Sequence, residues 1–213
     1  MTYTNRLAKK EWDERASTLE GAMSAILDRY DGDIETFYES GEKHVNDMMI
    51  ALGSVGVDSS RFKRVVDVGC GIGRLSVHFA DRFESVWATD ISQEMIDKAR
   101  RKGNISYVCT GSLTVLPPFF DAVLSHIVFQ HMSKEQFWRY LDESWEILKK
   151  GGIFCTQMHE TEYPYEPDGT ILVRGYTKQE LEDEIDQSKW EILGLLHPAG
   201  ESEIWKWLIL RKR

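Results

Sequence analysis

The chain has 213 residues, of which 42% are apolar and 29% charged, and its formal net charge is −9. This length suits one α/β domain with a buried core and is short for two. Because nucleic acids are bound by clustered Lys and Arg, 26 basic against 35 acidic side chains argue against a nucleic-acid partner. The cysteines Cys70, Cys109 and Cys155 have no metal or disulfide spacing, and the first residues show no apolar targeting stretch. We therefore expect a cytoplasmic protein with reduced thiols and no membrane partner.

The first fifty residues are expected to be helical, and Gly53 to Arg61 to form a polar connector. A helix is predicted by one apolar stripe, formed by Leu19, Met23, Ile26 and Leu27. The sequence Asp31-Gly32-Asp33 ends this helix, and a second helix is expected from Phe37 to Leu52.

From residue 64 onward, short apolar runs alternate with helical stretches, which is typical of a parallel sheet. The predicted strands cover residues 65–68, 86–89, 105–109, 120–125 and 153–158. Ser92 is expected to cap one helix, and Ser133 with Gln136 forms a capping box that opens another. We expect the second of these helices to stop at Gly151-Gly152.

The C-terminal part departs from this pattern. Residues 159–176 contain two prolines and no clear element, and Thr177 opens another capping box. Residues 192–196 and 204–210 flank a turn and predict an antiparallel hairpin. The expected fold class is therefore α/β: a doubly wound, mostly parallel seven-stranded sheet with an antiparallel C-terminal hairpin strand and an N-terminal helical cap.

The stretch VVDVGCGIGRLS (65–76) places Gly69, Gly71 and Gly73 between a predicted strand and a helix. Bare backbone N–H groups at such a turn can accept a nucleoside ligand, and tight strand–helix packing is the plain alternative. Asp90 ends the next predicted strand, where a carboxylate can accept both hydroxyls of a ribose. The glycine spacing and the bulk of Arg74 disfavour a dinucleotide, and no Walker lysine follows. An adenosine-bearing ligand is the favoured interpretation.

Four stretches carry a resemblance to a known family: DVGCGIGRLS (67–76), ATDISQEMIDKA (88–99), FDAVLSHIVFQHM (120–132) and WEILKKGGIFCTQ (145–157). On these residues the chain resembles the class I S-adenosylmethionine-dependent methyltransferases. The resemblance implies a Rossmann-like methyltransferase fold, the cofactor S-adenosyl-L-methionine and the product S-adenosyl-L-homocysteine. It implies one domain over residues 1–213, with a helical cap or lid (1–60), a cofactor-binding core (61–160), a substrate-side insertion (159–176) and a terminal helix and hairpin (177–213).

The resemblance also implies a role for each matching residue. The methionine moiety and sulfonium would lie against Gly69, Cys70, Gly71 and Gly73, while Asp67 orients the loop and the cofactor amine. Asp90 would hold the ribose hydroxyls, and Ile91 and Met95 would lie against adenine. Gly111, Ser112 and Leu113 fall where many relatives contact the adenine amino group, with Ser112 in place of an acidic residue. Ser125 and His126 would border the sulfonium.

His131 is the leading candidate for a general base, since imidazole can take a proton near neutral pH. A histidine that bonds backbone at a helix entry is the structural alternative. His126, His131, His159 and Glu160 lack the spacing of metal ligands, so no metal is expected. Stacking of Tyr163 and Tyr165 on a planar or sugar acceptor is a further hypothesis.

The predicted function is methyl transfer to an oxygen or nitrogen of a small-molecule acceptor, with a sugar or secondary metabolite as examples. A non-catalytic S-adenosylmethionine-binding protein and a protein or RNA methyltransferase remain alternatives, and a nicotinamide oxidoreductase is a third. The expected assembly is a monomer or homodimer.

Overall fold

A computed structural model of the chain describes residues 3–28, 30–161, 173–197 and 205–213. It contains two compact units, one of residues 1–46 with 63–111 and one of residues 47–62 with 112–213. The stacking hypothesis for Tyr163 and Tyr165 falls outside the described residues. The prediction of one domain over residues 1–213 stays a prediction.

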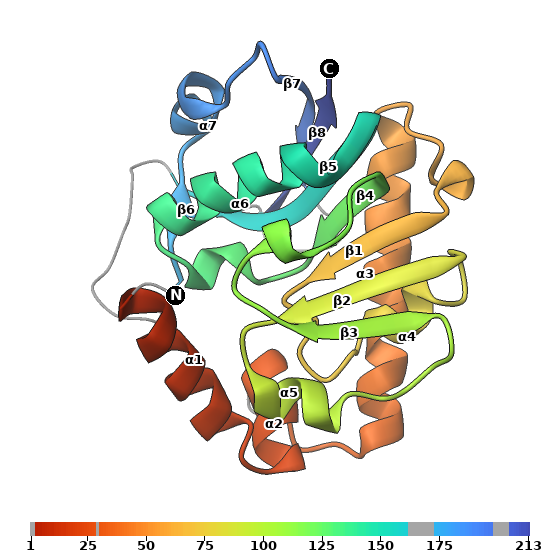
Figure 1. Cartoon of the computed structure of the whole chain (residues 1–213), viewed down its shortest axis with the longest axis vertical. Helices are drawn as coiled ribbons and strands as arrows, with labels where there is room; N and C mark the ends of the chain where they lie inside the picture. The colour runs from red at the N-terminus through yellow and green to blue at the C-terminus, as the bar shows by residue number, and fades with distance from the viewer. Residues whose placement is uncertain (1–2, 29, 162–172, 198–204) are drawn as a thin grey trace. The chain divides into compact units, whose positions relative to one another are not determined.

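The first unit holds three parallel strands in the order β3-β2-β1. Its apolar strand residues Val65, Val66 and Val68 are buried, as expected for a strand covered on both faces. Helix α1 packs on both α2 and α5 (Figure 1). The elements of this unit are α1 (Tyr3–Arg15), α2 (Leu19–Ile26), the first part of α3 (Ile34–Ser54), β1 (Arg64–Val68), α4 (Ser76–Phe79), β2 (Ser85–Asp90), α5 (Gln93–Lys98) and β3 (Ile105–Cys109).

In the first unit, two helices begin where a side-chain hydroxyl accepts a backbone N–H. The Gly21 N–H donates to Thr18 Oγ1 over 3.0 Å at the start of α2, and the Met95 N–H donates to Ser92 Oγ over 3.2 Å at the start of α5. These bonds satisfy N–H groups that have no partner inside the helix. The predicted cap at Ser92 is therefore confirmed.

The second unit combines parallel and antiparallel strands. Strand β4 pairs in parallel with β5, and the short β6 pairs in parallel with the end of β5. Strand β8 pairs antiparallel with both β5 and β7. The elements are the rest of α3, three short 3-10 helices at Ser59–Arg61, Leu113–Val115 and Phe129–His131, β4 (Phe120–Ser125), α6 (Lys134–Ile147), β5 (Leu148–Glu160), β6 (Gly175–Tyr176), α7 (Lys178–Glu184), β7 (Trp190–Leu196) and β8 (Trp205–Lys212).

The predicted fold class is confirmed: parallel strands alternate with helices, and the chain ends in an antiparallel hairpin. Both capping boxes are also confirmed, at Ser133 and at Thr177. The described residues contain eight strands where seven were predicted, because the two-residue β6 has no sequence pattern of its own.

The predicted end of α6 is wrong. The helix ends at Ile147, and Gly151-Gly152 lies inside β5. Leu148 is already extended and pairs with Phe120 of β4, and the register shifts before Ile153. Gly151 has φ +75°, so the glycine pair serves an irregularity of the strand and does not end the helix.

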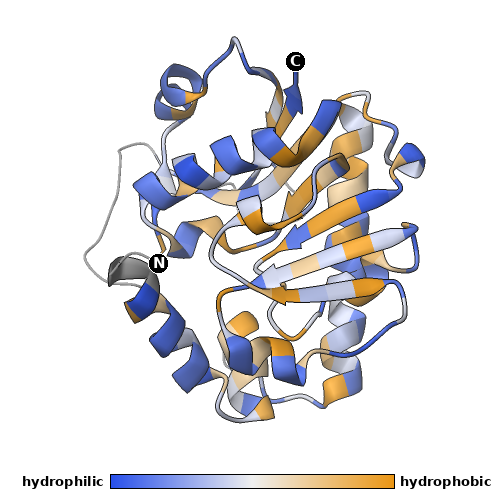
Figure 2. Cartoon of the chain, in the orientation of Figure 1, coloured by the Kyte–Doolittle hydropathy of each residue, from blue (hydrophilic) through white to orange (hydrophobic). Residues whose placement is uncertain are grey.

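The helices and strands differ in hydropathy. Strand β4 is mostly apolar and buried, whereas the coloured part of α1 is mostly hydrophilic (Figure 2). No helix among the described residues combines the length and the apolar character needed to cross a membrane.

Candidate functional site

The glycine loop after β1 adopts a backbone that only glycine takes easily. Gly69, Gly71 and Gly73 have φ values of 71°, 53° and 87°, all in the left-handed region. The N–H groups of Gly69 and Cys70 donate to the carbonyl of Thr89 over 2.7 and 2.9 Å. The loop is therefore fixed on the carboxyl end of β2.

Two of these glycines also face protein atoms at close range. A Cβ at Gly71 would lie 2.6 Å from Ile26 Cδ1 of α2 and 3.9 Å from Met95 Sδ. A Cβ at Gly73 would collide with the hydroxyl of Tyr107. Tight packing, the alternative left open by the sequence, therefore accounts for part of the glycine requirement. Ile26 and Tyr107 were predicted only as parts of a helix stripe and of a strand, and their contact with the loop was not predicted.

Close packing of the loop does not explain why a carboxylate, Asp90, lies beside it. Its Oδ2 accepts the Gly71 N–H over 2.9 Å, and its Oδ1 accepts the Ser92 N–H over 2.8 Å. Burial raises the pKa of the Asp90 carboxyl, while these two backbone bonds act in the opposite direction. A carboxylate has about four acceptor positions. Acceptor positions therefore remain on the Asp90 carboxylate beyond the bonds from Gly71 and Ser92, which fits the hydroxyls of a ribose.

Asp67 lies buried at the end of β1. Ser76 Oγ donates to its Oδ2 over 2.5 Å, and burial raises the pKa of Asp67 to about 7. The bond from Ser76 and the nearby charge of Arg74 oppose that shift. Arg74 is itself 1% exposed, and its Nη1 lies 3.3 Å from Ser40 Oγ and 3.0 Å from His44 Nδ1 of α3. The arginine after the glycines thus has a structural role that its sequence position does not reveal.

The other predicted cofactor residues of the first unit are Met95, Cys70, Ile91 and Gly111. Met95 is buried in a cluster with Ile72, and Ile26 packs against that cluster. Burial raises the pKa of the Cys70 thiol, so this thiol stays protonated at neutral pH. Ile91 and Gly111 are half-buried.

In the second unit, the predicted residues Ser112 and Leu113 form a short 3-10 turn. The Thr114 N–H donates to Ser112 Oγ over 3.3 Å. The Leu113 N–H donates to Glu143 Oε2 of α6 over 2.7 Å, so a buried carboxylate holds the turn. Glu143 was missed, although it falls on the buried stripe of α6 between Tyr140 and Ile147, which is an available sequence signal.

Ser125 and His126, at the end of β4, are both buried. The His126 ring lies 5.7 Å, centroid to centroid, from the Trp207 ring of β8. Ile127 follows with φ +52°, an unusual value for a β-branched residue. Such strained positions concentrate at functional sites.

His131 ends the short helix Phe129–His131 and is half-buried. Its backbone N–H donates to the Val128 carbonyl over 2.9 Å, and its Nε2 lies 3.5 Å from Gln130 Nε2. Its proposed role as a base stays a prediction.

His159 and Glu160 come from the end of β5. The His159 ring packs edge-on against Trp205, with ring centroids 5.3 Å apart, and burial lowers the pKa of His159. Glu160 Oε2 is ion-paired with Lys206 Nζ at 2.8 Å. Within the described ranges, no three His, Cys, Asp or Glu side chains gather closely enough to hold a metal ion.

A family model described as a methyltransferase domain matches residues 65–152 of the chain. In the solved structure of magnesium protoporphyrin IX methyltransferase from Synechocystis PCC 6803 with bound S-adenosylhomocysteine, the same fold recurs with a TM-score of 0.70. That alignment covers 99% of this chain and 100% of the neighbour at 14% identity. Residues 65–152 thus match a methyltransferase domain, and the chain has the fold of solved S-adenosylmethionine-dependent methyltransferases.

Other known methyltransferases are similar to the chain over different shares of their length. The malonyl-[acyl-carrier protein] O-methyltransferase of Enterobacter lignolyticus is 31% identical over 98 residues, which is 45% of this chain and 38% of that protein. The chain therefore spans less than half the length of that curated relative. The 1,6-didemethyltoxoflavin-N1-methyltransferase of Burkholderia thailandensis aligns with a TM-score of 0.68 at 18% identity, over 100% of this chain and 91% of the neighbour.

The range matched by the family model includes the glycine loop, Asp90, the turn at Ser112 and the segment from Ser125 to His131. Helices α1 and α2 lie before the match and β6 to β8 lie after it. The family match thus covers the central part of the chain and not the elements on either side of it.

Proposed function

We propose that this protein is a methyltransferase that transfers a methyl group from S-adenosyl-L-methionine to an oxygen or nitrogen of a small-molecule acceptor. The observation that carries the proposal is the Asp90 carboxylate, which two backbone N–H groups hold beside three left-handed glycines. Neighbours of the same fold were crystallised with S-adenosylmethionine or S-adenosylhomocysteine, which supports this cofactor. The sulfonium of the cofactor supplies an electrophilic methyl carbon.

The residues of the first unit would bind and orient the cofactor. Asp90 would accept both ribose hydroxyls, and Asp67 would act on the loop and on the cofactor amine. The backbone of Gly69, Cys70, Gly71 and Gly73 would contact the methionine moiety, and Ile91 and Met95 would pack on adenine. The cofactor ammonium would favour the ionised form of Asp67, whose pKa burial otherwise raises.

For the second unit, the family resemblance supports the proposed roles of five residues. Gly111 leads from the first unit to Ser112 and Leu113, which we assign to the adenine end. Ser125 and His126 are assigned to the sulfonium end. His131 would remove a proton from the acceptor, a step needed when the acceptor is a hydroxyl or a protonated amine.

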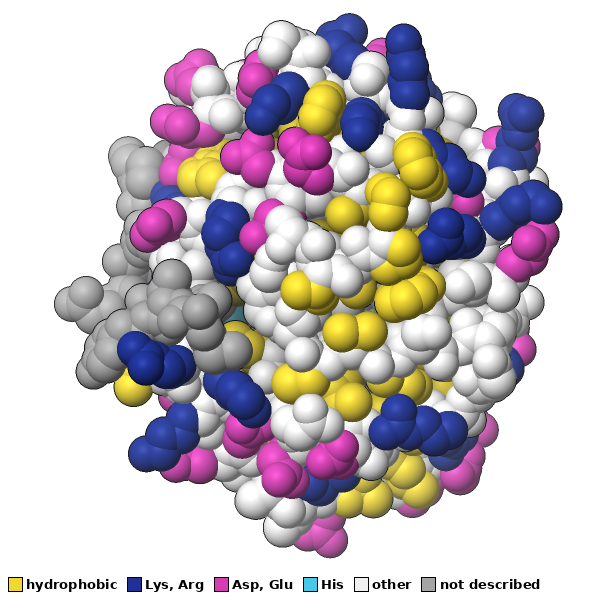
Figure 3. Space-filling view, viewed as in Figure 1, with side chains coloured by type: hydrophobic (Ala, Val, Ile, Leu, Met, Phe, Trp, Pro, Cys, Tyr) yellow, Lys and Arg dark blue, Asp and Glu magenta, His cyan; other side chains and the backbone are white. Residues whose placement is uncertain are grey.

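A small-molecule acceptor is favoured over RNA by charge. On the face shown in Figure 3, the Lys and Arg side chains of the described residues are interspersed with Asp and Glu. The net charge of −9 also argues against RNA as the acceptor, because RNA binding releases counterions only where cationic side chains are clustered. The names of two neighbours, for magnesium protoporphyrin IX and for 1,6-didemethyltoxoflavin, also refer to small molecules.

The test is calorimetry of the whole chain with S-adenosylhomocysteine. Asp90→Asn keeps the side-chain shape but replaces a charged acceptor by a neutral amide, so we expect affinity to fall about tenfold or more. Asp97→Asn, an exposed carboxylate on neighbouring α5, is the matched control and should bind like the wild type. Absence of heat with the wild type, or equal affinities for both variants, would contradict the proposal.

Transfer itself needs a second measurement. Incubation with methyl-labelled cofactor and a metabolite extract should give a labelled small molecule. A chain that binds the cofactor without transferring label to any acceptor would be a sensor, and label in protein or RNA would favour the macromolecular alternative.

A further inference from the structure

Helix α1 is attached to the first unit through a carboxylate. Asp13 Oδ1 accepts the hydroxyl hydrogen of Ser92 over 2.6 Å and the Glu94 N–H over 3.3 Å. Asp13 Oδ2 pairs with Lys9 Nζ at 2.6 Å, one turn earlier on the same helix. Because α1 is mostly hydrophilic (Figure 2), these polar contacts are a substantial part of how it docks, together with Trp12 and Ala16.

Ser92 connects this contact to Asp90. Its side chain is fully buried, and its Oγ accepts the Met95 N–H while it donates to Asp13. A hydroxyl has one hydrogen to donate, so the Asp13 bond fixes its orientation. The Ser92 N–H donates to Asp90 Oδ1 over 2.8 Å. A continuous set of hydrogen bonds therefore runs from α1 through Ser92 to the carboxylate assigned to the ribose.

We propose that Asp13 is a positioning residue for the cofactor: it fixes Ser92, and through it Asp90, so that docking of α1 and binding of the ribose stabilise each other. This inference rests on the proposed function, because it assumes that Asp90 takes the ribose hydroxyls. Coupling between two sites is reciprocal, so the cofactor must stabilise the docked helix by the same factor by which the docked helix improves affinity.

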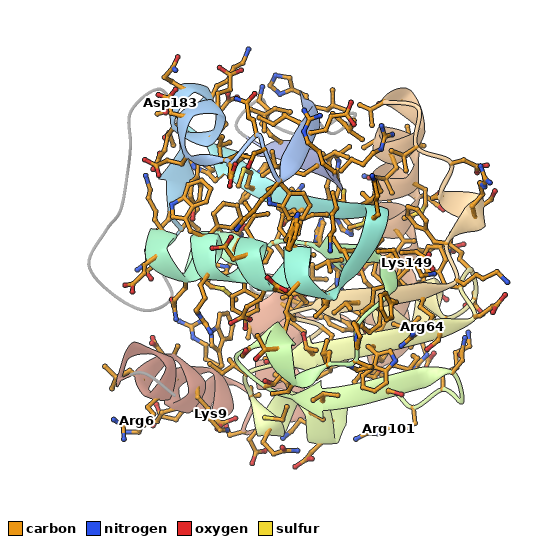
Figure 4. The ribbon with its side chains drawn as sticks, turned by 45° about the horizontal axis from the view of Figure 1, so that its top comes forward. Arg6, Lys9, Arg64, Arg101, Lys149 and Asp183 are labelled. Carbon is orange, nitrogen blue, oxygen red and sulfur yellow. The ribbon has the colours of Figure 1, made fainter. Side chains whose placement is uncertain are left out.

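The charges around Asp13 suit this role. Burial alone would raise the pKa of Asp13, but the bonds from Lys9, Ser92 and Glu94 outweigh it and lower the pKa. Lys9 comes from α1 itself, as Figure 4 shows with its neighbour Arg6, so the compensating charge belongs to the same helix as Asp13.

The same helix offers a matched control. Lys10 and Glu14 repeat the spacing of Lys9 and Asp13, but their Nζ and Oε1 lie 3.6 Å apart and their side chains are 74% and 65% exposed. Removing Glu14 therefore removes a carboxylate and an ion pair from α1 without touching Ser92. Any general effect of charge on α1 should appear in both variants.

The experiment compares dissociation constants for S-adenosylhomocysteine by calorimetry on the full chain. We expect Asp13→Ala to raise the dissociation constant about tenfold, equivalent to about 1.4 kcal/mol. Asp13→Asn keeps an oxygen acceptor for Ser92 and should recover part of the affinity, with a rise of about threefold. Glu14→Ala should stay within twofold of the wild type. If the Asp13→Ala variant does not fold, the Asp13→Asn variant alone tests the proposal.

Hydrogen exchange of the α1 amides gives the reciprocal readout. Saturating S-adenosylhomocysteine should slow exchange across residues 6–15 in the wild type and in Glu14→Ala, and much less in both Asp13 variants. Wild-type affinity in the Asp13 variants, or α1 exchange that the ligand does not change, would overturn the coupling alone. Absence of binding by the wild type would overturn the proposed function as well.

Discussion

Replacing Gly71 by alanine tests how the glycine loop is built. The left-handed backbone at Gly71, with φ +53°, costs an alanine about 1–2 kcal/mol. The new methyl group would also lie 2.6 Å from Ile26 Cδ1, so Ile26 must leave its rotamer at a cost of about 0.5–1.5 kcal/mol. Reduced freedom of the unfolded chain returns about 0.4–1 kcal/mol. We therefore expect the free energy of unfolding to fall by about 2 kcal/mol.

Urea denaturation of the ligand-free chain measures this change, and two further variants separate its causes. Gly103→Ala is the control, because no atom lies within 4 Å of its added Cβ, and it should change stability by less than about 0.5 kcal/mol. In an Ile26→Ala background, Gly71→Ala should cost about 1 kcal/mol less, because only the backbone cost remains. Equal stabilities for Gly71→Ala and Gly103→Ala would refute the reasoning on the loop. An unchanged cost in the Ile26→Ala background would refute the contact with α2.

Three further predictions concern strain, a buried carboxylate and pH. At Ile127, where φ is +52°, Ile127→Gly should be more stable than Ile127→Ala by about 1 kcal/mol in thermal or urea unfolding, the reverse of the usual order. Glu143→Ala should cost about 1.5–3 kcal/mol because it leaves the buried Leu113 N–H without its acceptor. Arg139→Ala, which removes a part-exposed ion pair with Glu143 and a contact with the Tyr140 ring, should cost less than about 1 kcal/mol, and equal costs would contradict this. The pKa of Asp67 is raised to about 7 by burial, against about 3.9 when unfolded, so folding binds a proton in this window and stability should fall as pH rises from about 4 to 7. Asp67→Asn should lessen that fall in urea denaturation at pH 5 and pH 7.5, and an unaltered slope would show that Asp67 does not titrate as described.

The sequence by itself determined those features that depend on neighbours along the chain. The capping boxes at Ser133 and Thr177 use residues three apart, and both formed as predicted. The strand 105–109 and the strand 120–125 were predicted with the bounds that the structure shows, because apolar runs between turn residues are local signals. The glycine loop and Asp90 likewise follow from a pattern of 22 residues between 69 and 90.

Tertiary structure decided what depends on residues far apart in the chain. The glycines at 151 and 152 resemble a helix end, but pairing of Leu148 with Phe120 of β4 took precedence over that local signal. The site residues that the sequence did not show act over long separations: Glu143 binds the N–H of Leu113, 30 residues away, and Asp13 binds Ser92, 79 residues away. The helical period can mark Glu143 as buried, but no motif in the sequence names the partner of either side chain. The packing of helices and strands brings these side chains together only after the elements have formed.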